Sequence, residues 1–579
     1  MTPEPVPPPT DEPADPYYGG PLGAGIDWAD PNSRLAPFYL TTSGVVAVAV
    51  LGVALVLLSL FPLSHTDFWA HLKYGEWITA NRALPDREPL CEFTDKSTAM
   101  FDPLWLSQVG YDALFRAGAA AAGGDDRSRF DGGVEAVRLA HTGAAVAALG
   151  LFGLAIRRAS GSVPWAAGGM VLILVLMLSP LAVQRPQAFA LVGYAAVLCA
   201  LSRDVLSRRA VVAVPLVMVL WANLHGAFVL GFGLLGAALL GRAVAVAVAV
   251  GNRWSLRAAC REVGVRRSAV ALALTLAAVA ALNPYGPALY LDVVRFAGHP
   301  NLRTVVEWQP LDFGQSRGGH WGYLATVVFV AAAQLASPRW FSPTQVLLVA
   351  TLGVWPLLQQ RAMAWWIPAA VWVAAPHWVA AAGRWGFTLP AGVPSFRKTA
   401  LAAVIATMLV VVSPASTWVK TGRPRPAVAA LNRATPNDIA DALAGRPPAD
   451  PDRVAGLTRA VREDHGGRFA GRVFASETQG DYLLWALPPD APVMMFNHAQ
   501  LFPPAYWTDC LAVKAAPGWG DFLDRHRAAA VVVEVDSSPA LCAGLRASPA
   551  WRVVVDEANT PARDPRGRLF VALRKPPTP

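Results

Sequence analysis

Long apolar runs separated by short polar loops fill most of the chain. A run of about 18 or more apolar residues predicts a helix that crosses a membrane. Only 15% of the residues are charged, against roughly a quarter in soluble domains. The sequence is therefore predicted to be a mainly helical, polytopic membrane protein with about eleven transmembrane helices. These lie near residues 43–63, 134–156, 165–183, 187–202, 210–223, 226–250, 268–283, 320–337, 343–358, 362–382 and 397–415.

Basic residues gather in alternate loops. Loops that face the cytoplasm are rich in Lys and Arg, so we expect a cytoplasmic N-terminus and a region after the last helix on the other side of the membrane. The net charge of +9 is spread between the apolar runs, so the lipid bilayer is the expected partner and nucleic acid is not. The basic loops hold Arg157, Arg158, Arg203, Arg208, Arg209, Arg253, Arg257, Arg261, Arg266, Arg267, Arg339, Arg384, Arg397 and Lys398.

Two other regions flank this predicted transmembrane domain of residues 41–415. Residues 1–40 are rich in Pro, Gly and acidic residues, a composition that predicts a disordered, cytoplasmic tail. Residues 416–579 carry more charge and no long apolar run. We expect them to form an extracytoplasmic linker and a small α/β domain.

The C-terminal domain alternates predicted strands and helices. The segments RVFASE, APVMMFN, AAVVVEVD, WRVVVDEA and RLFVALRK are typical of strands, and alternation with helices indicates an α/β domain. Asp481, Asn497 and His498 lie near strand ends, where such sheets often bind ligands. Glycan binding there is a hypothesis, and no phosphate-binding glycine pattern predicts catalysis. Cys510 and Cys542 form either a disulfide or two free thiols, since the five cysteines lack metal-ligand spacing.

The long first outer loop, residues 64–133, carries the stretch DFWAHLKYGEWI. Asp67 and His71 stand four residues apart, which places them on one face of a helix. The aromatic residues around them are typical of a helix at the level of the lipid headgroups. A second helix is predicted to start at Asp102–Pro103, an acidic N-cap followed by proline. The loop is thus expected to form two amphipathic helices lying on the membrane.

Further polar residues stand at the outward ends of the predicted helices. They occur in the segments QRPQ, WANLHG, NPYG, VEWQP and QQRAMAWW, which hold Arg185, His225, Asn283, Glu307 and Arg361. Ionisable groups are costly at such depths and tend to line a cavity. We therefore expect one polar cavity that opens outward.

Each of these residues also has a plainer interpretation. Asp67 could cap its helix, and His71 could serve only to bond Asp67. Arg185 and Arg361 could anchor helix ends at the membrane interface. His225 could bond neighbouring helices, and Asn283 could mark a helix stop.

The motif order DFWAHLKYGEWI, WLSQ, QRPQAFAL, WANLHGAFVLG, LNPYG and EWQP resembles bacterial membrane proteins related to the C-type (GT-C fold) glycosyltransferases. The resemblance covers most of residues 43–415. It implies a GT-C-like fold with amphipathic jaw helices in the first outer loop, in the bacterial inner membrane and serving the cell envelope. Fold alone does not establish activity.

The resemblance also implies a reaction. Enzymes of this fold take a sugar from a polyprenyl-phosphate donor and add it to an outward-facing acceptor, which is a glycan, a lipid or a protein. The family's first-loop acid corresponds to Asp67, a candidate base for the acceptor hydroxyl, with His71 beside it. Arg185 and Arg361 are candidate phosphate ligands because Arg binds phosphate in a bidentate manner. His225 would assist them, and Asn283 belongs to the same substrate-binding set.

No cofactor is identified with certainty. A divalent metal ion is compatible with the pattern, and Glu307 would either orient sugar hydroxyls or help to hold that ion, whose other ligands are unknown. Many members of the wider superfamily carry a pair of acidic residues in the first outer loop, and this chain departs from that pattern. Here Asp67 is followed by Phe68, and the next acid is Glu76. Two rival functions stay open: a transporter or flippase, and a non-catalytic protein that binds glycan or organises an envelope complex.

Overall fold

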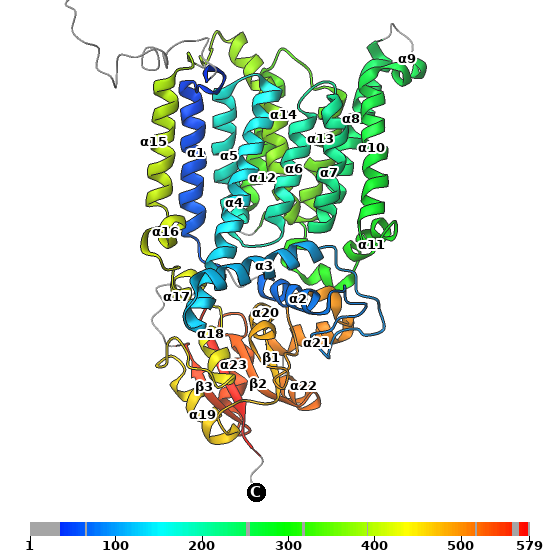
Figure 1. Ribbon diagram of the computed structural model, residues 1–579. Helices are drawn as coiled ribbons and strands as arrows, with labels where there is room; N and C mark the ends of the chain where they lie inside the picture. Colours follow the sequence, from blue (N-terminus) through cyan, green and yellow to red (C-terminus); the bar gives the residue numbers. More distant parts are fainter. Residues whose placement is uncertain are drawn as a thin grey trace, which may run out of the picture.

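The computed structural model describes residues 35–63, 67–249, 255–314, 319–390, 392–515, 518–558 and 567–576. Most of the predicted disordered tail, residues 1–34, lies outside them. The described chain forms a bundle of long helices at one end and a smaller domain with a four-stranded sheet at the other, as Figure 1 shows. The helices α2 (Phe68–Asn81) and α3 (Trp105–Ala122) lie between these two parts.

The bundle contains a helix at each position where the apolar pattern predicts one. Five described helices are long and apolar enough to cross a membrane, and a helix pair bent by 74° near residue 413 would add a sixth. The number of eleven membrane-spanning helices therefore stays a prediction. The bundle helices are α1 (Thr42–Leu60), α4 (Asp126–Ser160), α5 (Val163–Ala182), α6 (Gln187–Leu201), α7 (Arg208–Leu224), α8 (Val229–Ala249), α10 (Val263–Leu282), α12 (Gly319–Ala336), α13 (Pro343–Leu358), α14 (Met363–Arg384) and α15 (Phe396–Val412).

A buried ion pair fixes the end of α1, where the first outer loop begins. Arg138 of α4 pairs with Glu135 at 2.6 Å, and both side chains are almost fully buried. Arg138 also donates to the carbonyl oxygens of Ser59 and Phe61, at 2.8 and 2.7 Å. These carbonyl groups have no partner within α1 because they belong to its last turn. The α4 arginine thus holds the chain just before it enters the loop that carries Asp67.

The first outer loop forms the two predicted helices, α2 (Phe68–Asn81) and α3 (Trp105–Ala122). The start of α3 was predicted two residues too early. The Asp102 carboxylate accepts a hydrogen bond from the Leu104 backbone N–H at 3.1 Å, which makes a turn before the helix rather than its first residues.

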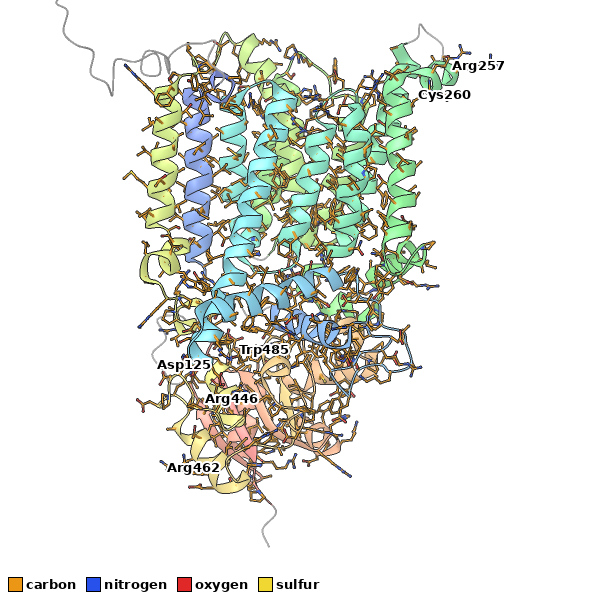
Figure 2. All side chains as sticks on the ribbon, in the orientation of Figure 1. Asp125, Arg257, Cys260, Arg446, Arg462 and Trp485 are labelled. Carbon is orange, nitrogen blue, oxygen red and sulfur yellow. The ribbon has the colours of Figure 1, made fainter. Side chains whose placement is uncertain are left out.

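The sequence predicted that the aromatic side chains of α2 lie at the headgroup level, and for three of the four this is wrong, because only Trp77 is partly exposed. Phe68, Trp69 and Tyr74 are completely buried. Trp69 packs against Trp485 of α20 (Glu477–Ala486), with ring centroids 4.8 Å apart. Figure 2 places Trp485 at the junction between the bundle and the C-terminal domain. These aromatic residues therefore fasten the C-terminal domain to α2.

The C-terminal domain is built on a mixed sheet in the order β1-β2-β4-β3. Strands β1 and β2 are parallel, whereas β4 pairs antiparallel with both β2 and β3. The strands are β1 (Arg472–Ala475), β2 (Ala528–Glu534), β3 (Trp551–Asp556) and β4 (Leu569–Arg574); the surrounding helices include α18 (Asn437–Leu443), α19 (Ala455–His465), α21 (Pro504–Ala515), α22 (Trp519–Arg525) and α23 (Pro539–Ala547). Four predicted strands and the α/β character of this domain are confirmed.

The segment APVMMFN was predicted as a strand and is not one. It makes a single isolated bridge to β1, between Val473 and Val493. The next carbonyl group, that of Met494, accepts from the Tyr506 hydroxyl instead of a strand. Cys510 and Cys542 are buried free thiols, so the disulfide alternative is wrong.

Candidate functional site

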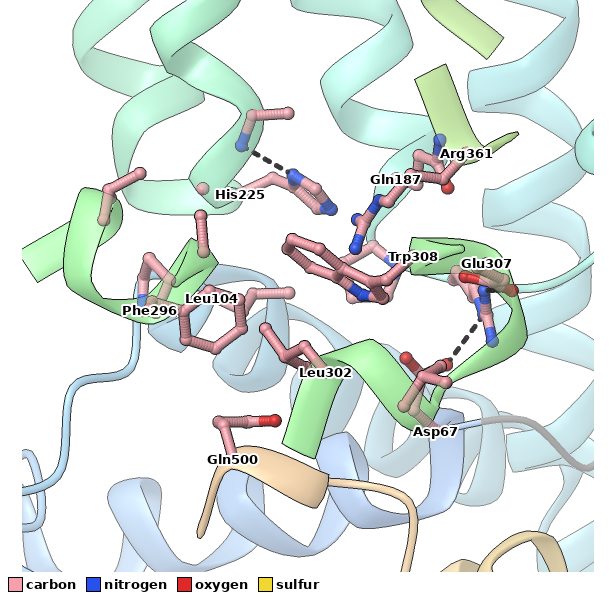
Figure 3. A pocket seen from close by; sticks show the side chains of 18 of the residues that line it. Asp67, Leu104, Gln187, His225, Phe296, Leu302, Glu307, Trp308, Arg361 and Gln500 are labelled. Atoms are coloured by element: carbon pink, nitrogen blue, oxygen red, sulfur yellow. Dashed lines mark hydrogen bonds and ion pairs between the residues drawn. The ribbon is translucent and has the colours of Figure 1, made fainter. Parts of the chain in front are cut away.

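A cavity of about 260 Å³ opens where the bundle, α2 and the C-terminal domain meet (Figure 3). Its walls come from segments far apart in the sequence, mostly loops at the ends of bundle helices. Six of the seven candidate residues line it: Asp67, His71, Arg185, His225, Glu307 and Arg361. The helix ends of one side of the bundle therefore converge, as the alternation of the loops predicted.

Asp67 stands at the N-cap position of α2, yet its side chain makes no capping hydrogen bond. One carboxylate oxygen, Oδ1, lies 3.0 Å from Nε of Arg185, and the other, Oδ2, lies 3.8 Å from Nε2 of His71. Burial alone would raise the pKa of Asp67, but Arg185 and His71 outweigh it and hold that pKa well below its usual range. The carboxylate is therefore ionised at neutral pH, and it faces the cavity instead of the helix backbone.

Arg185 lies in the loop between α5 and α6 and binds two carboxylates. Its Nε faces Asp67, and its Nη1 donates to Oε1 of Glu307. Glu307 belongs to the short 3-10 helix η4 (Val306–Trp308). One guanidinium thus joins the first outer loop to the loop after α11 (Ala288–Ala297), and it is engaged by protein groups on two sides.

Two buried polar side chains on the α3 side orient His71 through hydrogen bonds. Gln108 of α3 donates through its side-chain amide to Nδ1 of His71 and to Oδ1 of Asp102, both at 3.2 Å. Because an amide donor faces Nδ1, we assign the imidazole proton to Nε2, which points toward Asp67. Burial raises the pKa of Asp102. The hydrogen bonds of Gln108 therefore fix the tautomer of His71, whose Nε2–H points to the Asp67 carboxylate.

Arg361 and His225 occupy the bundle side of the cavity, with Trp308 between them and α2 (Figure 3). The Arg361 guanidinium carbon lies 4.3 Å above the Trp308 ring, in a cation–π contact. Within the described chain Arg361 makes no ion pair, unlike Arg185. His225 accepts from the backbone N–H of Ala227 through Nδ1 at 3.0 Å, which leaves Nε2 for the cavity. This side of the site thus holds a cation that forms no ion pair with the described chain, although Glu307 and Asp67 stand near enough to favour its charge.

The C-terminal domain completes the cavity. Asn497, His498 and Gln500 line it together with the bundle residues. The His498 ring stands edge-on to His71, with centroids 4.8 Å apart. Burial lowers the pKa of His498 to about 3, and the neighbouring His71 adds to the effect, so the imidazole is neutral at physiological pH.

Behind the cavity residue Asn497 lies the completely buried Asp481, which accepts a hydrogen bond from the Asn497 backbone N–H at 3.1 Å. Burial raises the pKa of Asp481 well above its usual value, and the charge on Asp67 raises it further. The sequence marked Asp481, Asn497 and His498 as residues near strand ends. No sequence signal indicated that Asn497 and His498 would line the same cavity as Asp67.

Asn283 lies outside the cavity wall. Its amide donates to the Ala222 carbonyl oxygen at 3.2 Å and to Oδ1 of Asn223 at 3.1 Å. Asn223 also accepts from Nε1 of Trp105 at 3.0 Å. Asn283 thus joins α7, α10 and α3 behind the site, in line with the plainer interpretation of the NPYG motif.

The donor set gives no metal centre in the described part of the chain. Among the residues that the structure describes, no three His, Cys, Asp or Glu side chains are grouped so as to hold a metal ion. Asp67 and Glu307 are both bound to Arg185. Arg185 thus holds the two carboxylates that a metal ion would use.

No protein-family model matches the sequence, and the comparison with curated proteins gives no match. Solved structures with a similar arrangement include the oligosaccharyltransferase AglB of Archaeoglobus fulgidus, in complex with an inhibitory peptide and a dolichol-phosphate. It is 12% identical, with a TM-score of 0.48 over 85% of this chain and 69% of that chain. ArnT of Cupriavidus metallidurans, bound to undecaprenyl phosphate, is 18% identical, with a TM-score of 0.43 over 91% of this chain and 96% of that chain. At these values the similarities alone assign no activity to this chain.

Proposed function

We propose that the chain is a membrane glycosyltransferase that moves a sugar from a polyprenyl-phosphate donor to an acceptor outside the cytoplasm. One observation carries this proposal. An ionised carboxylate and an arginine that forms no ion pair with the described chain converge in one cavity. Asp67 supplies the carboxylate and Arg361 the arginine. The scissile bond of such a donor joins the anomeric carbon of the sugar to a phosphate oxygen. The carboxylate would serve the acceptor hydroxyl that attacks this carbon, and the arginine would serve the phosphate that leaves.

The phosphate of the donor would bind on the bundle side. Arg361 is held flat against Trp308, so its guanidinium loses little freedom when it binds an oxyanion. His225 offers a second nitrogen. The lipid tail would leave along the apolar part of the wall, which includes Val293, Phe296 and Trp355.

The acceptor would bind on the α2 side. Its hydroxyl would donate to the Asp67 carboxylate, its oxygen would attack the anomeric carbon, and the bond from that carbon to the phosphate oxygen would break. The proton would pass to Asp67 as the new bond forms, and the phosphate would leave with the electron pair toward Arg361. Because the pKa of Asp67 is low, this carboxylate orients the hydroxyl more than it drives proton removal.

His71 and Arg185 would act as positioning residues. The Nε2 proton of His71 and the guanidinium of Arg185 hold the two oxygens of Asp67 from different sides. Asn497, His498 and Gln500 stand at the same opening. They would contact the acceptor, and the C-terminal domain would then contribute to acceptor choice.

The test is transfer from radiolabelled polyprenyl-phosphate sugars by the purified full chain in proteoliposomes. Arg361→Gln should raise the KM for the donor about tenfold, because one charge-assisted contact is worth roughly 1.5 kcal/mol or more. Arg295→Gln is the matched control, since this exposed arginine of α11 is not part of the cavity wall. An unchanged KM in Arg361→Gln, or an equal rise in Arg295→Gln, would contradict the proposed phosphate position. Movement of the whole donor across the bilayer without sugar transfer would favour the transporter alternative.

A further inference from the structure

A second cavity, of about 330 Å³, lies at the opposite end of the bundle from Asp67. It is enclosed by the loop after α6, the second half of α8, the start of α13 and the second half of α14. In Figure 1 these helix ends lie on the side away from the C-terminal domain. The cavity therefore has no part in the site described above.

Arginines dominate the charge of this cavity. Arg203, Arg242 and Arg339 line it, and among the residues that the structure describes the one carboxylate in its wall is Asp204. Arg242 is paired with Glu262 at 3.0 Å. The wall itself carries three guanidinium groups and one carboxylate, a net charge of +2, and Glu262 outside the wall neutralises Arg242. Arg203 and Arg339 form no ion pair with any residue that the structure describes.

Two pairs of neutral polar side chains in the cavity wall bond to each other. Nε2 of His377 lies 3.2 Å from Oε1 of Gln345, and Nε1 of Trp372 donates to Oγ of Ser202 at 2.8 Å. These groups form a fixed polar floor. The charged donors in the wall are guanidinium groups, which favour a planar or tetrahedral oxyanion.

Two neighbouring features fit a phosphate group carried by a lipid. The first turn of α13 lines the cavity from Pro343 onward; Ser342 and Gln345 cap this turn, and the helix of 16 residues adds only its dipole potential there. Trp340, also in the wall, is 88% exposed. An exposed tryptophan at the end of a bundle helix is typical of the level of the lipid headgroups.

We propose that this cavity binds the phosphate group of an anionic ligand, either the headgroup of a membrane phospholipid or a soluble phosphate ester. Arg203 and Arg339, which form no ion pair with the described residues, would supply the positive charge that faces the phosphate. Basic pockets between membrane helices commonly hold such headgroups. The proposal does not depend on the proposed glycosyltransferase activity, because it uses none of the residues around Asp67.

Native mass spectrometry of the delipidated full chain in detergent tests the site. The probes are phosphatidylglycerol, the zwitterionic phosphatidylcholine, and inorganic phosphate or glycerol phosphate as competitors. The double variant Arg203→Gln/Arg339→Gln should bind phosphatidylglycerol about tenfold more weakly or worse, while phosphatidylcholine binding stays unchanged. The control Arg209→Gln/Arg384→Gln removes two exposed arginines outside the cavity, and it should bind within about twofold of the wild type.

Each outcome decides the question. Displacement of the lipid by millimolar glycerol phosphate would support the soluble ester as the ligand, and persistence of the lipid would support the headgroup. Equal losses in both double variants would show that surface charge alone attracts the lipid, which would overturn the proposal. Unchanged binding of lipid and phosphate in Arg203→Gln/Arg339→Gln would overturn it as well. The melting temperature of each variant checks that the bundle remains folded.

Discussion

Removing the indole of Trp485 should loosen the C-terminal domain from α2. The Trp485 ring lies 4.8 Å from Trp69, 5.7 Å from Phe115 and 5.8 Å from Phe130, measured between ring centroids. Its Nε1 donates to Oε1 of Glu76 at 2.8 Å. Trp69 and Glu76 belong to α2, whose first residues follow Asp67. The indole therefore connects α20 to the helix that positions the carboxylate.

The expected magnitude follows from these contacts. Trp→Ala in a packed core costs about 3–5 kcal/mol, and each aromatic pair adds about 0.5–1.5 kcal/mol beyond the buried area. Trp485 is only half-buried, so the lower end, about 3 kcal/mol, applies to Trp485→Ala. Trp485→Phe keeps a ring but loses the bond to the partly exposed Glu76, and should cost about 1 kcal/mol.

Hydrogen exchange of α2 measures this loss directly. If local opening of the junction governs exchange, 3 kcal/mol corresponds to roughly a hundredfold faster exchange of the α2 amides in Trp485→Ala. Trp485→Phe should give roughly a fivefold increase. Trp385→Ala, which removes an exposed tryptophan beyond α14, is the control and should leave α2 unchanged. Equal α2 exchange in wild type and Trp485→Ala would refute the view that this cluster holds the junction.

Two further predictions concern buried polar groups. Burial raises the pKa of Asp481. The folded chain therefore keeps the carboxyl proton, while the unfolded chain releases it above about pH 4. The free energy of unfolding consequently falls as the pH rises from there. Asp481→Asn should therefore gain melting temperature relative to wild type between pH 5 and 8; parallel curves would contradict the buried acid. Asn223→Ala removes the acceptor of both Trp105 and Asn283 and should cost about 2 kcal/mol, whereas Asn283→Ala leaves the Trp105 bond and should cost less. Thermal unfolding in detergent compares the two, and equal losses would argue against Asn223 as the centre of this contact.

Much of the site could be predicted because its residues stand at helix ends. Apolar runs locate the helices, and alternation of the basic loops assigns every second loop to one side. Asp67, Arg185 and Arg361 had to lie on the same side for that reason. Their common cavity then follows from the cost of isolated charges at such positions.

The contribution of the C-terminal domain could not be predicted. His498 and His71 are separated by more than 400 residues, and neither periodicity nor charge pattern links such distant segments. The aromatic residues of α2 were equally ambiguous, because burial under a domain and contact with headgroups favour the same residue types. Only the packing of Trp69 on Trp485 distinguishes the two.

Local contacts explain the misplaced elements. The acid at Asp102 has the composition of an N-cap, but its carboxylate turns to the Leu104 N–H and delays the helix. APVMMFN has the composition of a strand, but the Met494 carbonyl group is taken by Tyr506. In both cases a side chain from the same region competes for a backbone group that the expected element would use.

We propose above that the Asp67 carboxylate assists transfer of a sugar from a lipid-linked donor. The most direct measurement compares wild type and Asp67→Asn, at equal protein level in proteoliposomes, for transfer and for donor binding. Asn keeps the shape of the side chain and removes its charge, and Arg185 keeps its partner Glu307. We predict that transfer falls about 10²-fold, the lower end of the range for loss of a group that takes a proton in the transition state, because Asp67 mainly orients the hydroxyl, while the donor still binds. Equal transfer by both proteins would contradict the account.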